Sequence, residues 1–209
     1  MTTKTANKHE LKTRETRALL LKAAETIFAR DGYEGSELGE IAALAGRTKG
    51  AIYAQFKSKE DVFLALIEDR TQRSREKIEK ALAESKTVAE NIMMLRTFYL
   101  GRIEDRAFCI LLLEYKLFAI RHPEAKERLQ KHYAKIFADQ GGNGFSHPFG
   151  VAKGADGISR AAAIQSMQSV ISALVLEAQM GNALSGEDVV RKVTARIFDA
   201  LMEVPTAGR

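Results

Sequence analysis

The chain has 209 residues, 45% of them hydrophobic, which suffices for one core or for a small domain joined to a larger one. Its single cysteine, Cys109, excludes an intrachain disulfide, and the lack of a long apolar run or an apolar signal region predicts a cytoplasmic protein without a membrane partner. The net charge of +5 is concentrated at the N-terminus, because residues 1–60 hold 11 Lys or Arg against 8 Asp or Glu, whereas residues 61–209 hold 21 against 19.

The basic N-terminal third is typical of a nucleic-acid-binding module, with a weakly basic globular protein as the alternative. Its first ten residues are polar, and Lys4 and Lys8, with Lys12, Arg14 and Arg17, form either an arm that touches DNA phosphates or a plain solvated tail. A helix is predicted from about Lys12 to Asp31, where apolar residues recur at helical spacing. Gly32 is expected to end this helix, and Ser36 is expected to cap the next one.

Residues 38–56 carry the pattern of two short helices joined by a tight turn. The first helix has one apolar stripe, and Gly46 follows it where a helix end favours a positive φ. Thr48 is placed to cap the second helix, whose buried side carries Ile52 and Phe56 one turn apart. A small core is therefore predicted from Phe28, Leu38, Ile41, Ile52 and Phe56. This arrangement is the helix-turn-helix pattern.

Charge distinguishes this stretch from an ordinary helical corner. Between Ala45 and Lys59 there are four Lys or Arg residues and no Asp or Glu. Gly50 and Ala51 keep the start of the second helix narrow, so that it fits a groove, and the side chains beyond them suit phosphates or base edges. The predicted contacts with double-stranded DNA are Ser36, Arg47, Thr48, Lys49, Gly50, Ala51, Tyr53, Ala54, Gln55, Lys57 and Lys59.

Residues 12–66 resemble the TetR family of transcriptional regulators. The matching positions, in family order and spacing, are Gly32-Tyr33, Ile41-Ala42, Ala45-Gly46, Lys49-Gly50, Ile52-Tyr53, Phe56 and Ser58-Lys59-Glu60. Three residues depart from the usual pattern and put the individual phosphate contacts in question, namely Glu37, Arg47 and Gln55. The resemblance implies an all-α protein, with an N-terminal arm and three-helix DNA-binding domain at residues 1–58 and a ligand-binding and dimerisation domain at residues 59–209.

The remainder of the chain is predicted to be helical. A fourth helix begins at Ser58, and its polar stretch from Glu68 to Lys77 is interpreted as a connector between domains. His122-Pro123 is expected to break the chain, and residues 139–157, with six Gly and one Pro, are predicted to form a flexible loop. Two final helices are predicted at about 159–180 and 187–204. Their extra apolar surface suits a homodimer bundle, or else only caps the core of one protomer.

The helices between residues 88 and 137 are rich in Met and aromatic side chains, which suit an adaptable apolar pocket or an ordinary core. Glu114 interrupts an apolar run and has three possible roles: facing a ligand, pairing with Arg102 or Arg106, or pointing to solvent. The candidate contacts to an apolar or amphipathic effector are Tyr99, Phe108, Glu114, Tyr115, Phe118 and Tyr133.

No pattern in the sequence predicts catalysis, a cofactor or a metal. The four histidines lack metal-ligand spacing, the Gly-rich segment lacks a phosphate-binding motif, and no serine lies in a nucleophile elbow. We therefore predict a repressor that binds a palindromic operator as a homodimer and is released by a small molecule. The alternatives are a regulator without a small-molecule inducer, and an enzyme or carrier with an incidental basic corner.

Overall fold

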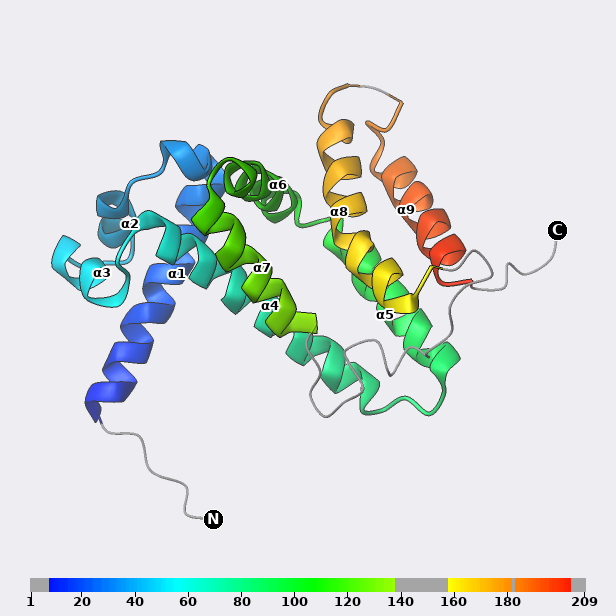
Figure 1. The fold of residues 1–209 in the computed structure, drawn as a ribbon, viewed down its shortest axis with the longest axis horizontal. Helices are drawn as coiled ribbons and strands as arrows, with labels where there is room; N and C mark the ends of the chain where they lie inside the picture. Colours follow the sequence, from blue (N-terminus) through cyan, green and yellow to red (C-terminus); the bar gives the residue numbers. More distant parts are fainter. Residues whose placement is uncertain (1–7, 138–157, 182, 204–209) are drawn as a thin grey trace, which may run out of the picture. The chain divides into compact units, whose positions relative to one another are not determined.

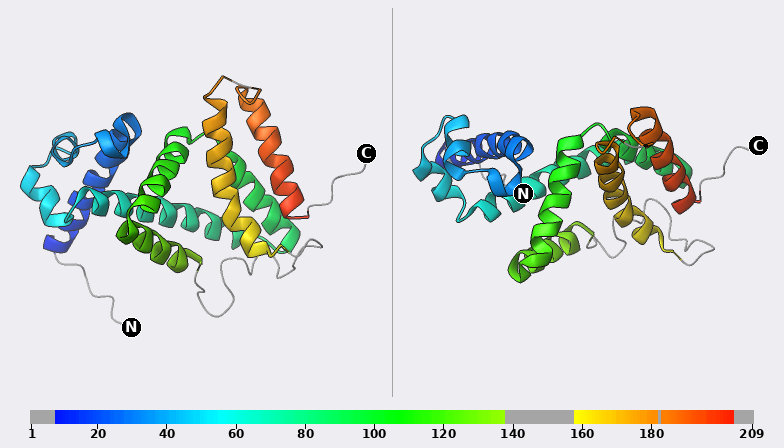
Figure 2. Two further views of the ribbon diagram at one scale, coloured as in Figure 1. Left: turned by 45° about the horizontal axis from the view of Figure 1, so that its top comes forward. Right: turned by 90° about the horizontal axis from the view of Figure 1, so that it is seen from above.

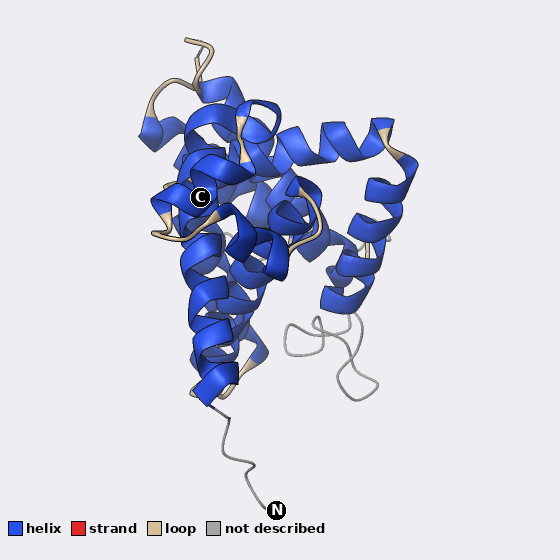
Figure 3. Cartoon of the chain, turned by 90° about the vertical axis from the view of Figure 1, so that its left-hand side faces the viewer, coloured by secondary structure: helices blue, strands red, loops and turns tan. Residues whose placement is uncertain are grey.

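The structure is a computed structural model that describes residues 8–137, 158–181 and 183–203. These residues form nine helices and no strand (Figure 3). The Gly-rich segment 139–157 and the first seven residues of the basic arm lie outside the described residues. In chain order the helices are α1 (Lys8–Gly35), α2 (Leu38–Leu44), α3 (Lys49–Gln55), α4 (Lys59–Leu82), α5 (Val88–Arg102), α6 (Arg106–Arg121), α7 (Pro123–Phe137), α8 (Arg160–Ala178) and α9 (Glu187–Leu201).

The chain divides into two compact units, Met1–Arg70 and Thr71–Arg209. The division falls within α4, because the start of α4 contributes to the core of the first unit. Six consecutive residues of α4, from Val62 to Ile67, are buried. The polar stretch from Glu68 to Lys77 continues the same helix without a break.

The core of the N-terminal unit forms where α1, α2 and α3 meet the start of α4. Phe63 of α4 packs edge-on against Phe28 and Tyr33, with ring centroids 5.0 Å and 5.1 Å away. Tyr33 reaches this cluster because Gly32 breaks α1, with φ 72° and ψ 178°, a conformation that side-chain-bearing residues rarely adopt. The predicted core residues Phe28, Ile41, Ile52 and Phe56 are buried, and Leu38 is partly buried.

The C-terminal unit is built on α5, α8 and α9, which pack beside one another (Figures 1 and 2). Its core combines apolar side chains of these three helices with Cys109 of α6 and Ile78 of α4. Two polar contacts orient α5 within the unit. Arg96 donates twice to the carboxylate of Asp199 on α9, at 2.7 Å and 3.0 Å, and the Tyr99 hydroxyl donates to the backbone oxygen of Ile164 at 2.8 Å.

The helix boundaries in this unit follow from local chemistry. The break at His122-Pro123 is confirmed, since α6 ends at Arg121, His122 is extended and α7 starts at the proline. A capping box that was not predicted begins α5: Thr87 accepts from the N–H of Glu90, and the Glu90 carboxylate accepts from the N–H of Thr87.

Helix α8 is long and apolar enough, by length and composition alone, to cross a membrane. Core helices of soluble proteins satisfy the same criterion. Ile164, Met167, Ile171 and Val175 of α8 are buried against the core of the C-terminal unit. We therefore interpret α8 as a core helix.

Replacing Phe63 with Ala is expected to destabilise the N-terminal unit by about 3–5 kcal/mol, because it empties the centre of the aromatic cluster. Urea unfolding followed by circular dichroism measures this loss. The matched control is Tyr53→Ala, since the Tyr53 side chain is 57% exposed and its removal leaves no cavity. Equal stability of the two variants would contradict the assigned core.

Candidate nucleic-acid interface

The turn between α2 and α3 is closed by backbone hydrogen bonds. The Arg47 N–H donates to the carbonyl of Ala42 at 2.8 Å, and the Gly46 N–H donates to the carbonyl of Ala43 at 3.0 Å. These two bonds are the Schellman pattern of a helix end, which places one residue in the left-handed region. Gly46 takes that position with φ 64°, as the sequence predicted. The chain therefore reverses within a few residues and begins α3 at a defined angle.

Helix α3 begins at Thr48, whose hydroxyl accepts a hydrogen bond from the N–H of Ala51 at 3.2 Å. The predicted cap is thus confirmed. Gly50 is exposed, and a Cβ added there would meet only the Thr48 hydroxyl at 3.7 Å. Packing therefore does not require a glycine at this position. The absence of a side chain instead leaves the helix surface at Gly50 without a protruding group.

The outer face of α3 consists of exposed side chains. Lys49, Gly50 and Ala54 are exposed, and Tyr53 is 57% exposed. The inner face carries Ile52, which is fully buried. The Lys49 side chain extends across α2, because a Cβ added at Gly39 would lie 2.6 Å from the Lys49 Cε. Gly39 thus leaves the space through which this lysine crosses the surface.

Besides Lys49, the other three cations between Ala45 and Lys59 differ in their contacts. The Lys57 side chain is exposed, and its backbone N–H donates to Asp61 at 3.0 Å. Arg47 is partly buried and donates to the carbonyl of Gly46 at 3.1 Å. The Lys59 ammonium donates to the carbonyls of Glu34 and Ser36, at 2.9 Å and 3.2 Å.

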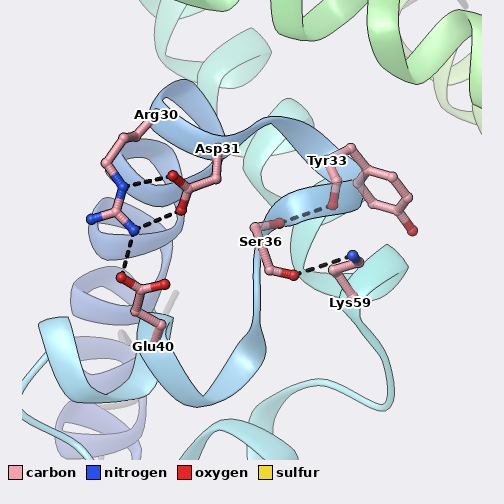
Figure 4. A network of polar contacts seen from close by, with 6 residues as sticks. All are labelled: Arg30, Asp31, Tyr33, Ser36, Glu40 and Lys59. Carbon is pink, nitrogen blue, oxygen red and sulfur yellow. Dashed lines mark hydrogen bonds and ion pairs between the residues drawn. The ribbon is translucent and has the colours of Figure 1, made fainter.

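Lys59 also lies 4.9 Å from the centre of the Tyr33 ring, so that it joins the start of α4 to the end of α1 (Figure 4). The charge of Lys59 is thus directed at backbone carbonyls. The predicted helix cap at Ser36 is wrong. Ser36 is 2% exposed, its hydroxyl donates to the Tyr33 carbonyl at 2.9 Å, and Glu37 occupies the N-cap position of α2 without a side-chain capping hydrogen bond.

Two arginines of α1 contact this surface or its neighbouring helix, Arg17 of the predicted arm and Arg30, for which no role was predicted. Arg17 donates to the carbonyl of Gln55 at 3.5 Å, and its guanidinium lies 4.5 Å from the centre of the Phe56 ring. Arg30 binds its neighbour Asp31 in α1 and also Glu40 in α2 (Figure 4). The hydrogen bonds from Arg30 lower the pKa of the Asp31 carboxyl. Tertiary packing brings Arg17 to Gln55 and Arg30 to Glu40, so that sequence spacing offered no signal for these two contacts.

Residues 20–66 match the model of the family described as bacterial regulatory proteins, tetR family. These residues of the chain are therefore a TetR-family domain.

Two curated regulators and one solved structure illustrate how far the similarity to TetR proteins extends. The chain is 32% identical over 76 residues to the fatty acid metabolism regulator protein of Bacillus subtilis. It is 49% identical over 53 residues to the transcriptional repressor BepR of Brucella suis. These stretches cover 36% and 25% of this chain, and 39% and 25% of the relatives. The matched proteins are transcriptional regulators and not enzymes.

The similarity of fold extends over most of the chain. The structure of the regulator FadR from Bacillus subtilis in complex with stearoyl-CoA aligns with a TM-score of 0.63 at 20% identity. The alignment covers 90% of this chain and 99% of that one. The all-α TetR fold is therefore confirmed for both parts of the chain.

The side chains predicted to contact a TetR effector occupy several environments in the C-terminal unit. Tyr99 and Tyr115 are buried, and burial raises the pKa of both Tyr99 and Tyr133, that of Tyr133 to about 12. Phe118 is partly buried and stacks on His122 at 3.9 Å. Phe108 is also buried, with the Arg102 guanidinium 4.9 Å from its ring centre, and Glu114 is partly buried.

A cavity of about 210 Å³ lies elsewhere in the same unit. It is lined by residues from the α5–α6 turn, the end of α8 and the start of α9, including Ile103, Arg106, Val175 and Gln179. None of the six predicted effector contacts lines it. Within the described parts of the chain, no group of three or more His, Cys, Asp or Glu side chains is arranged to hold a metal ion.

Lys59→Met is expected to destabilise the N-terminal unit by about 1 kcal/mol, since two backbone carbonyls are deprived of a charged donor. Lys57→Met removes the same charge two residues away from an exposed side chain and should leave stability unchanged. Urea unfolding of both variants measures the difference. If Lys57→Met were the more destabilising substitution, the assignment of Lys59 as a structural link would be wrong.

Proposed function

We propose that the chain is a DNA-binding transcriptional repressor that acts as a homodimer in the cytoplasm, binds an operator of two-fold symmetry and is released by a small molecule. The observation that carries the proposal is the outer face of α3. It combines an exposed lysine, an exposed tyrosine and a low surface at Gly50 on a helix held by a capped turn.

The exposed residues of this face suit the major groove. A helix fits the groove when its outward side chains are short or reach base edges, and cations at its ends hold the phosphates. We assign the contacts to Lys49, Gly50, Ala51, Tyr53 and Ala54 of α3, with Arg47, Thr48, Gln55 and Lys57 beside them. Ser36 and Lys59 are left out of the interface, because their polar atoms bind the chain's own backbone.

The names of two relatives support the regulatory part of the proposal. BepR is a transcriptional repressor, and the FadR structure contains stearoyl-CoA. By analogy we propose an apolar or amphipathic effector for this chain, bound among the helices of residues 88–137. An effector that binds a conformation whose recognition helices no longer match the operator would release DNA by shifting the population. A coupling of about 1–3 kcal/mol is typical of such systems.

The homodimer is proposed through α8 and α9, whose outward faces carry apolar residues. Leu176 of α8 and Val189 of α9 are 37% and 38% exposed, Leu174 and Val193 are partly exposed, and Met180, in the turn just after α8, is 64% exposed. Apolar surface of this kind favours burial against a second copy. A dimer also explains the proposed operator symmetry, because two recognition helices read two half-sites.

A regulator without a small-molecule inducer is the second candidate. It is favoured by the packing of Tyr99, which is buried and donates its hydroxyl to the Ile164 carbonyl as a core residue would. In that case the repressor would respond to a protein partner or act constitutively, and the DNA interface would be the same.

Lys49→Ala is expected to weaken DNA binding and to reduce its salt dependence, because it removes a cation from the start of α3. Fluorescence anisotropy with a short duplex of arbitrary sequence measures the slope of log K against log salt. That slope should become shallower by about 0.9 for each phosphate that Lys49 neutralises. The control Lys126→Ala removes the same charge from the exposed surface of α7 and should change nothing. An unaltered slope in Lys49→Ala would refute the proposed contact.

Leu176→Glu and Val193→Glu are expected to convert the native dimer to a monomer, because each places a charge in the proposed interface. Sedimentation velocity at micromolar concentration measures the assembly state. Leu117→Glu, at a more exposed apolar position on α6, is the control and should remain dimeric. A monomeric native chain, or a Leu117→Glu variant that alone dissociates, would exclude an α8–α9 dimer.

A further inference from the structure

Arg102, the last residue of α5, is a largely buried cation without a carboxylate partner among the described residues. Its guanidinium lies 4.9 Å from the centre of the Phe108 ring and 6.0 Å from that of Phe98. Its one side-chain hydrogen bond is a long one, 3.4 Å to the hydroxyl of Ser74 on α4. The Nε–H group is buried and has no hydrogen-bond partner in the described structure. Three elements thus surround a guanidinium with apolar rings and one hydroxyl.

Three other partly buried arginines are paired with acids. The side chains of Arg70, Arg75 and Arg96 are 17%, 14% and 26% exposed, and they bind Glu25, Glu79 and Asp199 respectively. Removing a cation from water is costly unless an anion and hydrogen bonds replace the lost hydration. Cation–π contacts recover only part of that cost. Burial accordingly lowers the pKa of Arg102, although the group stays charged at neutral pH.

We propose that Arg102 binds the anionic head group, a carboxylate or a phosphate ester, of an amphipathic ligand whose apolar part lies against Phe98 and Phe108. The planar guanidinium of an arginine can bind either anion through two parallel hydrogen bonds. In Arg102 the Nε–H donor has no acceptor in the described structure. The two rings beside the guanidinium provide apolar surface for the start of the ligand's tail. This inference rests on the proposed small-molecule control and specifies the chemical class of the effector.

Lys116 of α6 is the competing cation in the same unit. Its ammonium donates to the Ser169 hydroxyl at 2.8 Å and lies 5.8 Å from the centre of the Tyr133 ring. A good hydrogen bond to a partner on α8 already satisfies part of this ammonium, and a lysine offers no planar fork. Arg102 is the better anion receptor because its described contacts leave more of its donors without an acceptor.

The test is calorimetric titration of the full chain, without DNA, with decanoate, decyl phosphate and decanol below the concentrations at which they aggregate. The three probes share one tail, so that a preference for either anion reports the head-group site. Decanoate or decyl phosphate should bind about tenfold or more tightly than decanol, as a charged hydrogen bond implies. The anion that binds more tightly identifies the head group as a carboxylate or a phosphate.

Arg102→Met should abolish the preference for anions and leave decanol binding unchanged. Arg121→Met, which removes an exposed arginine from α6, and Lys116→Met should both retain the preference. The proposal is overturned if no anion binds, if decanol binds equally well, or if the preference survives in Arg102→Met. It is also overturned if the preference is lost in Lys116→Met alone.

Thermal unfolding of the unliganded variants tests whether an acidic residue of the chain itself already neutralises Arg102. Arg96→Met breaks the pair with Asp199 and should lower Tm, whereas Arg102→Met should leave Tm unchanged or raise it. An equal decrease of Tm in both variants would reveal an internal partner and overturn the proposal. The titration contains no DNA, so that it tests the anion site independently of regulation. If the anion binds at Arg102 but does not change the affinity of the chain for DNA in a separate measurement, this inference stands and the proposed effector control is refuted.

Discussion

The left-handed turn at Gly46 is the constraint on which the DNA-binding surface depends. Two hydrogen bonds, from the N–H groups of Gly46 and Arg47 to carbonyls of α2, close that helix and set the direction in which the chain leaves it. The Thr48 cap then starts α3 within two residues. With the turn fixed, burial of Ile52 determines the face of α3 that remains outside, and this is the face proposed to enter the groove.

The Lys and Arg residues of this chain have two different roles, which composition alone does not distinguish. Arg17, Arg30 and Lys59 bind carbonyls or carboxylates of the N-terminal unit and hold its helices together. Lys49 and Lys57 have exposed side chains, that of Lys49 crossing α2 at Gly39, and we propose that both bind phosphates. A basic DNA-binding module therefore has fewer groups for DNA than its net charge suggests. In the C-terminal unit the same distinction separates Arg96, which is paired, from Arg102, whose described contacts include no carboxylate.

The features predicted correctly from the sequence are those that local chemistry determines. The positive φ at Gly46, the Thr48 cap and the break at Pro123 each depend on one residue and its near neighbours. The structural roles of Ser36 and Lys59 were not predicted because they depend on contacts formed on folding, those of Lys59 with residues 23 and 25 positions away. The aromatic pattern of α5 and α6 likewise did not distinguish a pocket from a core, since both require apolar residues at helical spacing.

Selection of bound duplexes from a random pool tests the central claim most directly, because it examines the outer face of α3 and the assembly of two chains together. The account predicts enrichment of an inverted repeat whose half-sites are separated by the spacing of two recognition helices. In a parallel selection, Tyr53→Ala should change the preferred bases within each half-site without altering their separation. Enrichment of no sequence, or of a single site without symmetry, would contradict the account.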